Sequence, residues 1–254
     1  MSMFQELWRR LIFFSGDVRA LHAFPYVTWS VHHHQIDYDE VMDVLPLIQY
    51  GDVGVHRDWG YLSNVGIPGF MKHAWLHVQD GVTRAAIVEA ISEGVVQRNA
   101  MYAMFSDYSM LLSPKDVSDE ERKGACKKVQ GIVGAHYDAA FKFNIEEELK
   151  FYAGKEQDDA VKQLDEGQQY IRKYDYSFSC TEAVSYAWWH KREDLRLYRQ
   201  EVRGRSVILA DHFINRGWDI KWMSKSVTTD IAKKYGLGEE GLSMMEEYRA
   251  RDAS

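Results

Sequence analysis

The sequence predicts an α+β protein in which a small antiparallel β-sheet packs on helices. From residue 51 onward, short apolar or alternating runs separated by glycine, aspartate and asparagine are typical of strands, namely "GDVGVH", "HAWLHV", "AAIVEA" and "GVVQR". Other stretches carry apolar residues at spacings of three and four, which is the period of amphipathic helices. With 254 residues and 46% apolar composition, the chain can bury one substantial core.

The main domain is expected over residues 46–224, between two helical extensions. In the N-terminal extension, residues 1–45, the runs "FQELWRRLIFF" and "IDYDEVMDVLPLI" have helical periodicity. The C-terminal tail, residues 225–254, predicts one or two terminal helices that either dock on the body or fray. Inside the main domain, residues 145–175 hold nine acidic and five basic residues, which indicates a solvated helical insertion or lid.

Charge and cysteine content exclude several classes of protein. The net charge of −7 and the lack of a basic block argue against a nucleic-acid partner. Cys126 and Cys180 lie 54 residues apart, without the spacing of a zinc site or the density of a disulfide scaffold, which favours a reducing compartment. Arg9 and Arg10 precede only four apolar residues, too few for a signal peptide or a membrane span. We therefore expect a soluble protein without a signal peptide, in the cytoplasm.

Two predicted helices place the cysteines in different environments. Ser118, three residues before Glu121, forms the pattern of a capping box, and the periodicity that follows puts Cys126 inside an amphipathic helix. Ser179 is a good N-cap for the run "SCTEAVSYAWW", so Cys180 falls in the first turn of a helix. Unpaired backbone N–H groups and the helix dipole stabilise a thiolate at that place. Cys180 is therefore the candidate nucleophile, and Cys126 is expected to be inert.

A histidine and a glutamate in neighbouring predicted strands complete a candidate triad. A catalytic thiolate needs an imidazole to protonate the leaving group, and a third polar group to orient that imidazole. His73 begins the run "HAWLHV", and Glu89 lies 16 residues later in "AAIVEA". A hairpin can bring two such positions side by side.

The residues that carry these features also carry a family resemblance. In order, the chain contains a "GD" strand, a histidine on the next strand, a "VEA…GV" motif, a "YD" pair and a final Cys-Thr-Glu helix. This order resembles the circularly permuted papain-like cysteine amidases, the YiiX-like branch of the NlpC superfamily. The resemblance covers residues 46–144 and 176–224, and it implies a permuted papain-like core.

The resemblance implies a role for each matching residue. Cys180 would be the nucleophile, His73 the general base and acid, and Glu89 the residue that orients the imidazole. Tyr137, in the "YD" pair, would lie near the oxyanion or the substrate. The "GD" dipeptide at 51–52 would serve the fold, by a tight entry into the first strand and by holding a turn.

The implied activity is hydrolysis of an amide or peptide bond through a thioester, without a cofactor or metal. The expected substrates are short peptides, peptidoglycan-type cross-links or N-acyl amino compounds. The insertion and both helical extensions lie outside the match, and the extensions offer a surface for a protein partner. Two alternatives stay open: a thiol acyltransferase or esterase that acts on lipid acyl groups, and a non-catalytic assembly protein that keeps the papain-like core.

Other polar residues have simpler explanations. His77 shares a strand face with His73, but no further ligand completes a metal site, so an interior histidine is expected. Three consecutive histidines at 32–34 point in different directions and do not make a closed site. Glu182 is expected to serve the helix N-terminus. Asp211 and His212 could form a second acid–imidazole pair, although nothing in the sequence places them at the cleft.

Overall fold

The computed structural model describes a large central part of the chain. The described residues are 18–20, 27–29, 35–58, 60, 61, 64, 67–79, 86–138, 177–188, 195, 197, 200–202 and 205–252. Three predictions fall outside them: the helix over "FQELWRRLIFF", the histidine tract and the acidic insertion.

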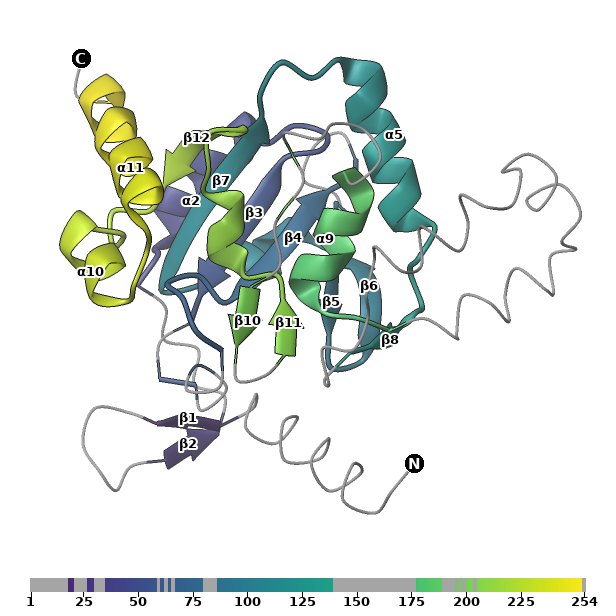
Figure 1. Cartoon of the computed structure of the whole chain (residues 1–254), viewed down its shortest axis with the longest axis horizontal. Coiled ribbons are helices and arrows are strands. Elements are labelled where there is room, and N and C mark those ends of the chain that lie inside the picture. Colours follow the sequence, from purple (N-terminus) through teal and green to yellow (C-terminus); the bar gives the residue numbers. More distant parts are fainter. Residues whose placement is uncertain are drawn as a thin grey trace, which may run out of the picture.

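An open antiparallel sheet forms the centre of the described part of the chain (Figure 1). Its strand order is β12-β7-β3-β4-β5-β6, and every neighbouring pair is antiparallel. The predicted α+β class is therefore confirmed, and the four predicted strand runs correspond to β3 to β6. The strands are β3 (Val53–Arg57), β4 (His73–His77), β5 (Ile87–Ile91), β6 (Gly94–Arg98), β7 (Tyr108–Pro114) and β12 (Trp218–Met223).

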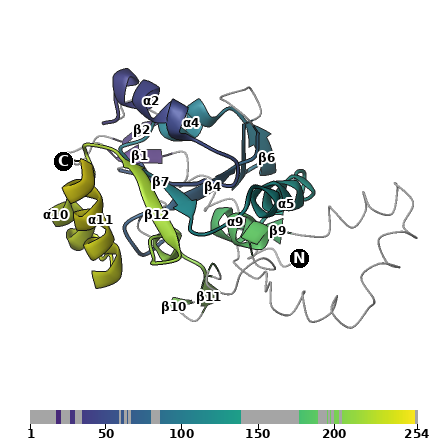
Figure 2. The same ribbon diagram turned by 90° about the horizontal axis from the view of Figure 1, so that it is seen from above.

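Helices cover both faces of the sheet (Figure 2). On one face α5 (Asp119–Gln130) and α9 (Cys180–Trp188) pack into the larger apolar core. On the other face a second apolar cluster is formed by α2 (Tyr38–Val44) and α4 (Ala100–Met104), with the 3₁₀ turn η1 (Leu45–Leu47) between α2 and β3. The four inner strands β3, β4, β5 and β7 are thus buried along nearly all of their length, whereas the edge strands β6 and β12 are partly exposed.

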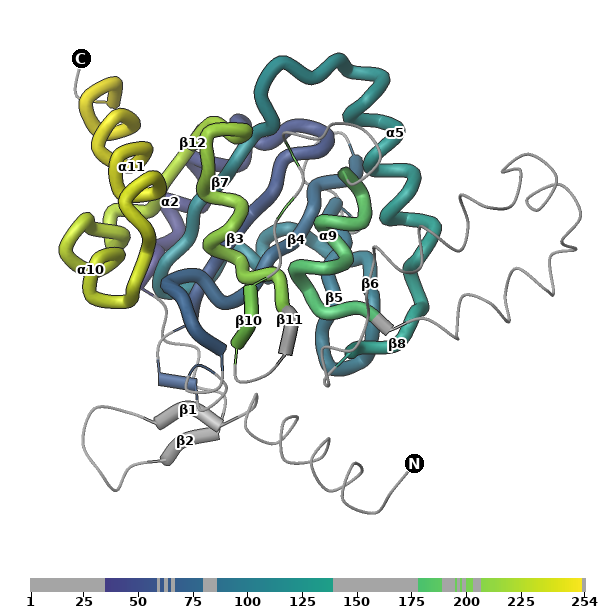
Figure 3. The backbone as a smooth tube through the Cα atoms, viewed as in Figure 1, coloured from purple at the N-terminus to yellow at the C-terminus, as the bar shows by residue number. Residues whose placement is uncertain are grey.

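The C-terminal tail docks on the body. It contains α10 (Thr229–Lys234) and α11 (Glu239–Asp252), which lie beside β12 (Figure 3). Ala232 and Met245 are fully buried in the same core as α9. The tail is therefore part of the main core, and of the two predicted states the docked one is observed.

The described part of the N-terminal extension contains both helix and strand. The predicted helix over "IDYDEVMDVLPLI" is present as α2 and η1. Between the two runs predicted to be helical, β1 (Val18–Ala20) and β2 (Val27–Trp29) form an antiparallel pair that the prediction of a helical extension did not include. Their sequences, "VRA" and "VTW", include β-branched and aromatic residues that favour extended backbone.

Short elements complete the described structure. They are the parallel pair β8 (His136–Tyr137) and β9 (Ser177–Phe178), the hairpin β10 (Gln200–Val202) and β11 (Arg205–Val207), and the 3₁₀ turn η3 (Ala210–Phe213). None of the helices described here is long and apolar enough to cross a bilayer.

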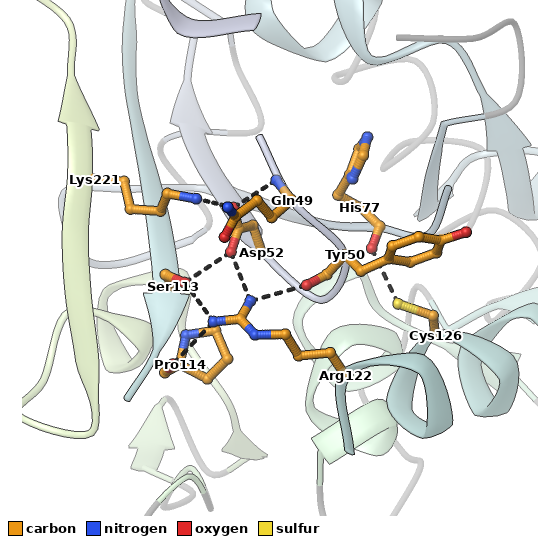
Figure 4. A network of polar contacts seen from close by, with 9 residues as sticks. All are labelled: Gln49, Tyr50, Asp52, His77, Ser113, Pro114, Arg122, Cys126 and Lys221. Carbon is orange, nitrogen blue, oxygen red and sulfur yellow. Dashed lines mark hydrogen bonds and ion pairs between the residues drawn. The ribbon is translucent and has the colours of Figure 1, made fainter. Parts of the chain in front are cut away.

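A buried ion network anchors the start of β3 (Figure 4). Asp52 is completely buried, and its Oδ1 accepts hydrogen bonds from the Ser113 hydroxyl at 2.8 Å and from Arg122 at 3.0 Å. Its Oδ2 accepts from Lys221 Nζ and from the backbone N–H of Gln49, both at 2.8 Å. Asp52 therefore holds the turn into β3, as predicted, and also ties β7, α5 and β12 together.

Candidate active site

The N-terminus of α9 presents the predicted nucleophile. Cys180 is the first residue of the helix, and Ser179 precedes it. Glu182 Oε2 accepts hydrogen bonds from the Ser179 backbone N–H at 3.0 Å and from its hydroxyl at 2.8 Å, while the Glu182 N–H donates to the Ser179 hydroxyl oxygen at 3.4 Å. This reciprocal pattern is a capping box. The predicted structural role of Glu182 is consistent with these contacts.

The β4–β5 hairpin brings His73 and Glu89 together. Trp75 is directly opposite Glu89, so His73, two residues earlier, is diagonal to Glu89 on the same face. His73 Nε2 lies 2.6 Å from Glu89 Oε2. Because Nε2 faces the carboxylate, Nδ1 is the ring nitrogen that can serve the cysteine.

The Cys180 thiol lies against the first residues of β4. Its Sγ is 3.9 Å from the carbonyl oxygen of Lys72, and the thiol interacts electrostatically with the His73 side chain. Burial acts to raise the pKa of the Cys180 thiol. The His73 imidazolium and the backbone N–H groups of Ala74 and Thr181 outweigh burial, so the pKa falls below its ordinary value. These are the contacts that stabilise a reactive thiolate.

His73 is shifted in the opposite direction. Burial acts to lower its pKa, but the Cys180 thiolate and the Glu89 carboxylate raise it to about 10. The two opposite shifts favour a thiolate–imidazolium pair over a neutral thiol and imidazole.

Glu89 is fully buried between two cations. His73 of β4 is one, and Arg98 of β6 is the other, with its Nε donating to Glu89 Oε1. Burial acts to raise the pKa of the Glu89 carboxyl, yet His73 and Arg98 lower it to about 2. Glu89 is consequently ionised, and it can hold His73 in one orientation. Arg98 was missed in the sequence, although it is diagonal to Glu89 across the β5–β6 hairpin "EAISEGVVQR".

His56 is a second residue that the sequence analysis missed. It is the cross-strand partner of His73, with 4.8 Å between the ring centroids. Burial and the neighbouring His73 lower the pKa of His56 to about 4, so its imidazole is neutral. Among the described residues, its Nδ1 has no hydrogen-bond partner. The only sequence signal was its place at the end of the run "GDVGVH".

Tyr137 lies near the nucleophile. It is at the end of β8 and pairs with Phe178 of β9, two residues before Cys180. Burial raises the pKa of the Tyr137 phenol, and the negative charges of Cys180 and Glu182 act in the same direction. The phenol therefore stays protonated, and it can donate a hydrogen bond at this side of the site.

Asp211 and His212 do not pair with each other. Asp211 accepts from the backbone N–H groups of Phe70 and Met71, each at 2.6 Å. His212 Nδ1 accepts from the Leu209 N–H at 3.3 Å, and its Nε2 lies 3.3 Å from Gln200 Oε1. The considered acid–imidazole pair is thus wrong, because the two side chains serve different backbone segments.

Cys126 has the properties of an inert cysteine. It lies inside α5, and its thiol donates to the His77 carbonyl at 3.2 Å (Figure 4). Burial raises its pKa to about 12. Within the described ranges, no group of three or more histidine, cysteine, aspartate or glutamate side chains is arranged to hold a metal ion.

The structure thus brings Cys180, His73 and Glu89 into one chain of contacts, with Tyr137 nearby. A thiol with a lowered pKa, an imidazole with a raised pKa and an ionised carboxylate in this order can perform nucleophilic attack on a carbonyl and protonate a leaving group. Comparison with family models, curated proteins and solved structures found no match for this chain.

Proposed function

We propose that this protein is a cysteine hydrolase that cleaves an amide or peptide bond through a thioester. The observation that carries the proposal is the chain of contacts from Cys180 through His73 to Glu89, in which the pKa of the thiol is lowered and that of the imidazole is raised. We further propose that its architecture is a permuted papain-like core. The cysteine at a helix N-terminus, packed against strands that carry the histidine and the glutamate, supports this assignment.

The first half of the reaction follows from the positions of the three side chains. The Cys180 thiolate attacks the carbonyl carbon of the substrate, and a carbon–sulfur bond forms as the carbonyl oxygen takes up negative charge. The His73 imidazolium then gives its proton to the amine nitrogen as the carbon–nitrogen bond breaks. The amine leaves, and an acyl group remains on Cys180 as a thioester.

The second half returns the enzyme to its starting state. Neutral His73 takes a proton from a water molecule, and the resulting hydroxide attacks the thioester carbon. The carbon–sulfur bond breaks, a carboxylic acid is released, and the thiolate–imidazolium pair is restored. Throughout, Glu89 keeps the imidazole in one tautomer and orientation through the 2.6 Å hydrogen bond to Nε2.

The proposed test measures the reactivity of each cysteine as a function of pH. The purified chain is treated with iodoacetamide, and alkylation of Cys180 and Cys126 is followed separately by peptide mass spectrometry. We expect Cys180 to react rapidly well below the ordinary thiol pKa of about 8.5. Cys126, whose pKa is raised to about 12, provides the internal control. A His73→Ala variant should lose the fast reaction at low pH.

The same protein is then offered amide substrates, with Cys180→Ala as the inactive control. Short peptides, peptidoglycan-type peptides and N-acyl amino compounds are the first set to screen. Ordinary, slow reaction of both cysteines in the folded protein would refute the hydrolase and support a binding or assembly role. A reactive Cys180 that forms a thioester but passes the acyl group only to an added amine would instead support an acyltransferase.

A further inference from the structure

The loop that leads into β4 is tightly fixed. Phe70 and Met71 are completely buried, so their backbone N–H groups cannot reach water. Both N–H groups donate to the carboxylate of Asp211, one to each oxygen, at 2.6 Å. Burial raises the pKa of the Asp211 carboxyl, and these two N–H groups act against that rise. A buried N–H without a partner is costly, so both contacts hold the loop.

Gly69 adapts the loop to this carboxylate. Its φ is +90°, a conformation that favours glycine, and a Cβ at this position would lie 2.5 Å from Asp211 Oδ2. On the other side of the loop, the Arg57 guanidinium donates to the carbonyl oxygens of Gly69 and Phe70, at 3.4 and 3.0 Å. The loop is therefore held by two side chains: the Asp211 carboxylate binds its N–H groups, and the Arg57 guanidinium binds its carbonyl oxygens.

This loop forms part of the candidate active site. The N–H of Lys72 donates to the His56 carbonyl oxygen at 2.9 Å, and the Lys72 carbonyl oxygen contacts Cys180 Sγ at 3.9 Å. The next residue is His73. A displacement of the loop would consequently move the imidazole relative to the thiolate.

The segment that supplies Asp211 also contacts the helix of the nucleophile. Three residues before Asp211, the carbonyl oxygen of Ile208 accepts a hydrogen bond from the Thr181 hydroxyl at 2.7 Å. Thr181 follows Cys180 in the first turn of α9, and its backbone N–H helps to stabilise the thiolate. Residues 208–211, which we call the connector, therefore touch both the thiolate side and the imidazole side of the site.

We propose that the connector sets the distance between Cys180 and His73, and that Asp211 is a positioning residue of the active centre. This inference rests on the proposed thiolate–imidazolium pair, and it assigns to Asp211 a role that neither the triad nor the resemblance includes. The physical basis is that two short segments, one carrying Cys180 and the other His73, are hydrogen-bonded to the same stretch of four residues. Small errors in the position of reacting groups reduce rates strongly.

The test uses one variant at each end of the connector. Asp211→Asn removes the charge and places an amide N–H₂ against a backbone N–H, so one of the two loop contacts is lost. Thr181→Val removes the hydroxyl with little change in side-chain volume, and Thr181→Ser keeps the hydroxyl and serves as the rescue variant. The exposed Asp219→Asn, in an ion pair with Lys115 at 3.3 Å, is the matched control for the charge change.

The readout is the pH profile of Cys180 alkylation by iodoacetamide. In Asp211→Asn and Thr181→Val we expect the rate at pH 6 to fall about tenfold and the profile to move to higher pH. Thr181→Ser and Asp219→Asn should keep the wild-type profile. Asp52→Asn, which weakens an ion network away from the connector, tests whether loss of stability alone moves the profile, and we expect that it does not.

The outcomes separate this inference from the proposed function. If wild-type Cys180 reacts as an ordinary thiol, the proposed hydrolase is refuted. If wild-type Cys180 is reactive and Thr181→Val keeps the same profile, the connector has no positioning role. An equal shift in Asp52→Asn would assign the effect to stability and would likewise overturn the inference.

Discussion

Replacing Glu89 with glutamine tests the electrostatic argument for the triad most directly. Glutamine has nearly the same shape as glutamate, and its carbonyl oxygen can still accept the hydrogen bond from His73 Nε2. What is lost is the negative charge between His73 and Arg98. The new amide N–H₂ would also face Arg98 Nε, so that hydrogen bond is lost too, and a change in the reactivity of Cys180 reports the loss of the charge and of the Arg98 contact.

The size of the effect can be worked out from the pKa of Glu89. His73 and Arg98 together lower it from its ordinary 4.5 to about 2, against the effect of burial. This difference corresponds to a net interaction of about 3 kcal/mol, of which His73 provides part. If half of it acts on His73, the imidazolium in Glu89→Gln is destabilised by about 1.5 kcal/mol, which lowers the pKa of His73 by about one unit.

The assay is again the rate of Cys180 alkylation between pH 5 and 10, with thermal unfolding to confirm that the variant is folded. We expect the upper titration of the profile, which reports loss of the proton from the His73 imidazolium, to move down by about one pH unit. Glu93→Gln is the matched control, because Glu93 is an exposed residue of the same hairpin whose carboxylate accepts from the Ser92 hydroxyl at 2.8 Å. An unchanged profile in a folded Glu89→Gln protein would refute the reasoning.

Three further predictions concern stability. Asp52→Asn should lower the free energy of unfolding by about 3 kcal/mol in urea titration, because it leaves Lys221 and Arg122 without their buried counter-charge; a loss below 1 kcal/mol would contradict this. Ser179→Ala should lower the free energy of unfolding by about 1 kcal/mol in urea titration, because it removes the capping hydroxyl of α9. Ser118→Ala, which removes the equivalent hydroxyl at α5, should give a loss of similar size. The pKa of Glu89 is lowered on folding, so ionised Glu89 contributes fully to the free energy of unfolding above pH 4.5, and this contribution is lost as the pH falls to about 2. In urea unfolding over this range, the free energy of unfolding of Glu89→Gln should therefore depend less on pH than that of the wild type.

Local sequence patterns predicted the parts of the fold that depend on local physics. The capping box of Ser118 and Glu121 and the strand runs that became β3 to β6 were found because caps and apolar runs are read within a few residues. The strands β7 and β12 were not predicted, although β7 lies between β3 and β12 in the sheet. Their places depend on long-range pairing, because β7 pairs with β3 and β12 pairs with β7 about one hundred residues earlier in the chain. No local pattern specifies such pairing.

For the site, the sequence by itself determined which residues have suitable chemistry. A cysteine at a helix start, a histidine at a strand start and a glutamate on the next strand are local features, and the hairpin spacing was enough to predict the contact of His73 with Glu89. Only the tertiary structure decided the environment of these groups. Burial, the second cation at Arg98 and the neutral His56 ring set the charge states, because these depend on desolvation and on neighbours from other strands. The tertiary structure also showed that Asp211 binds the loop before His73 and does not pair with His212. A carboxylate accepts hydrogen bonds from whichever buried N–H groups the folded chain brings within reach, and the local sequence does not specify those groups.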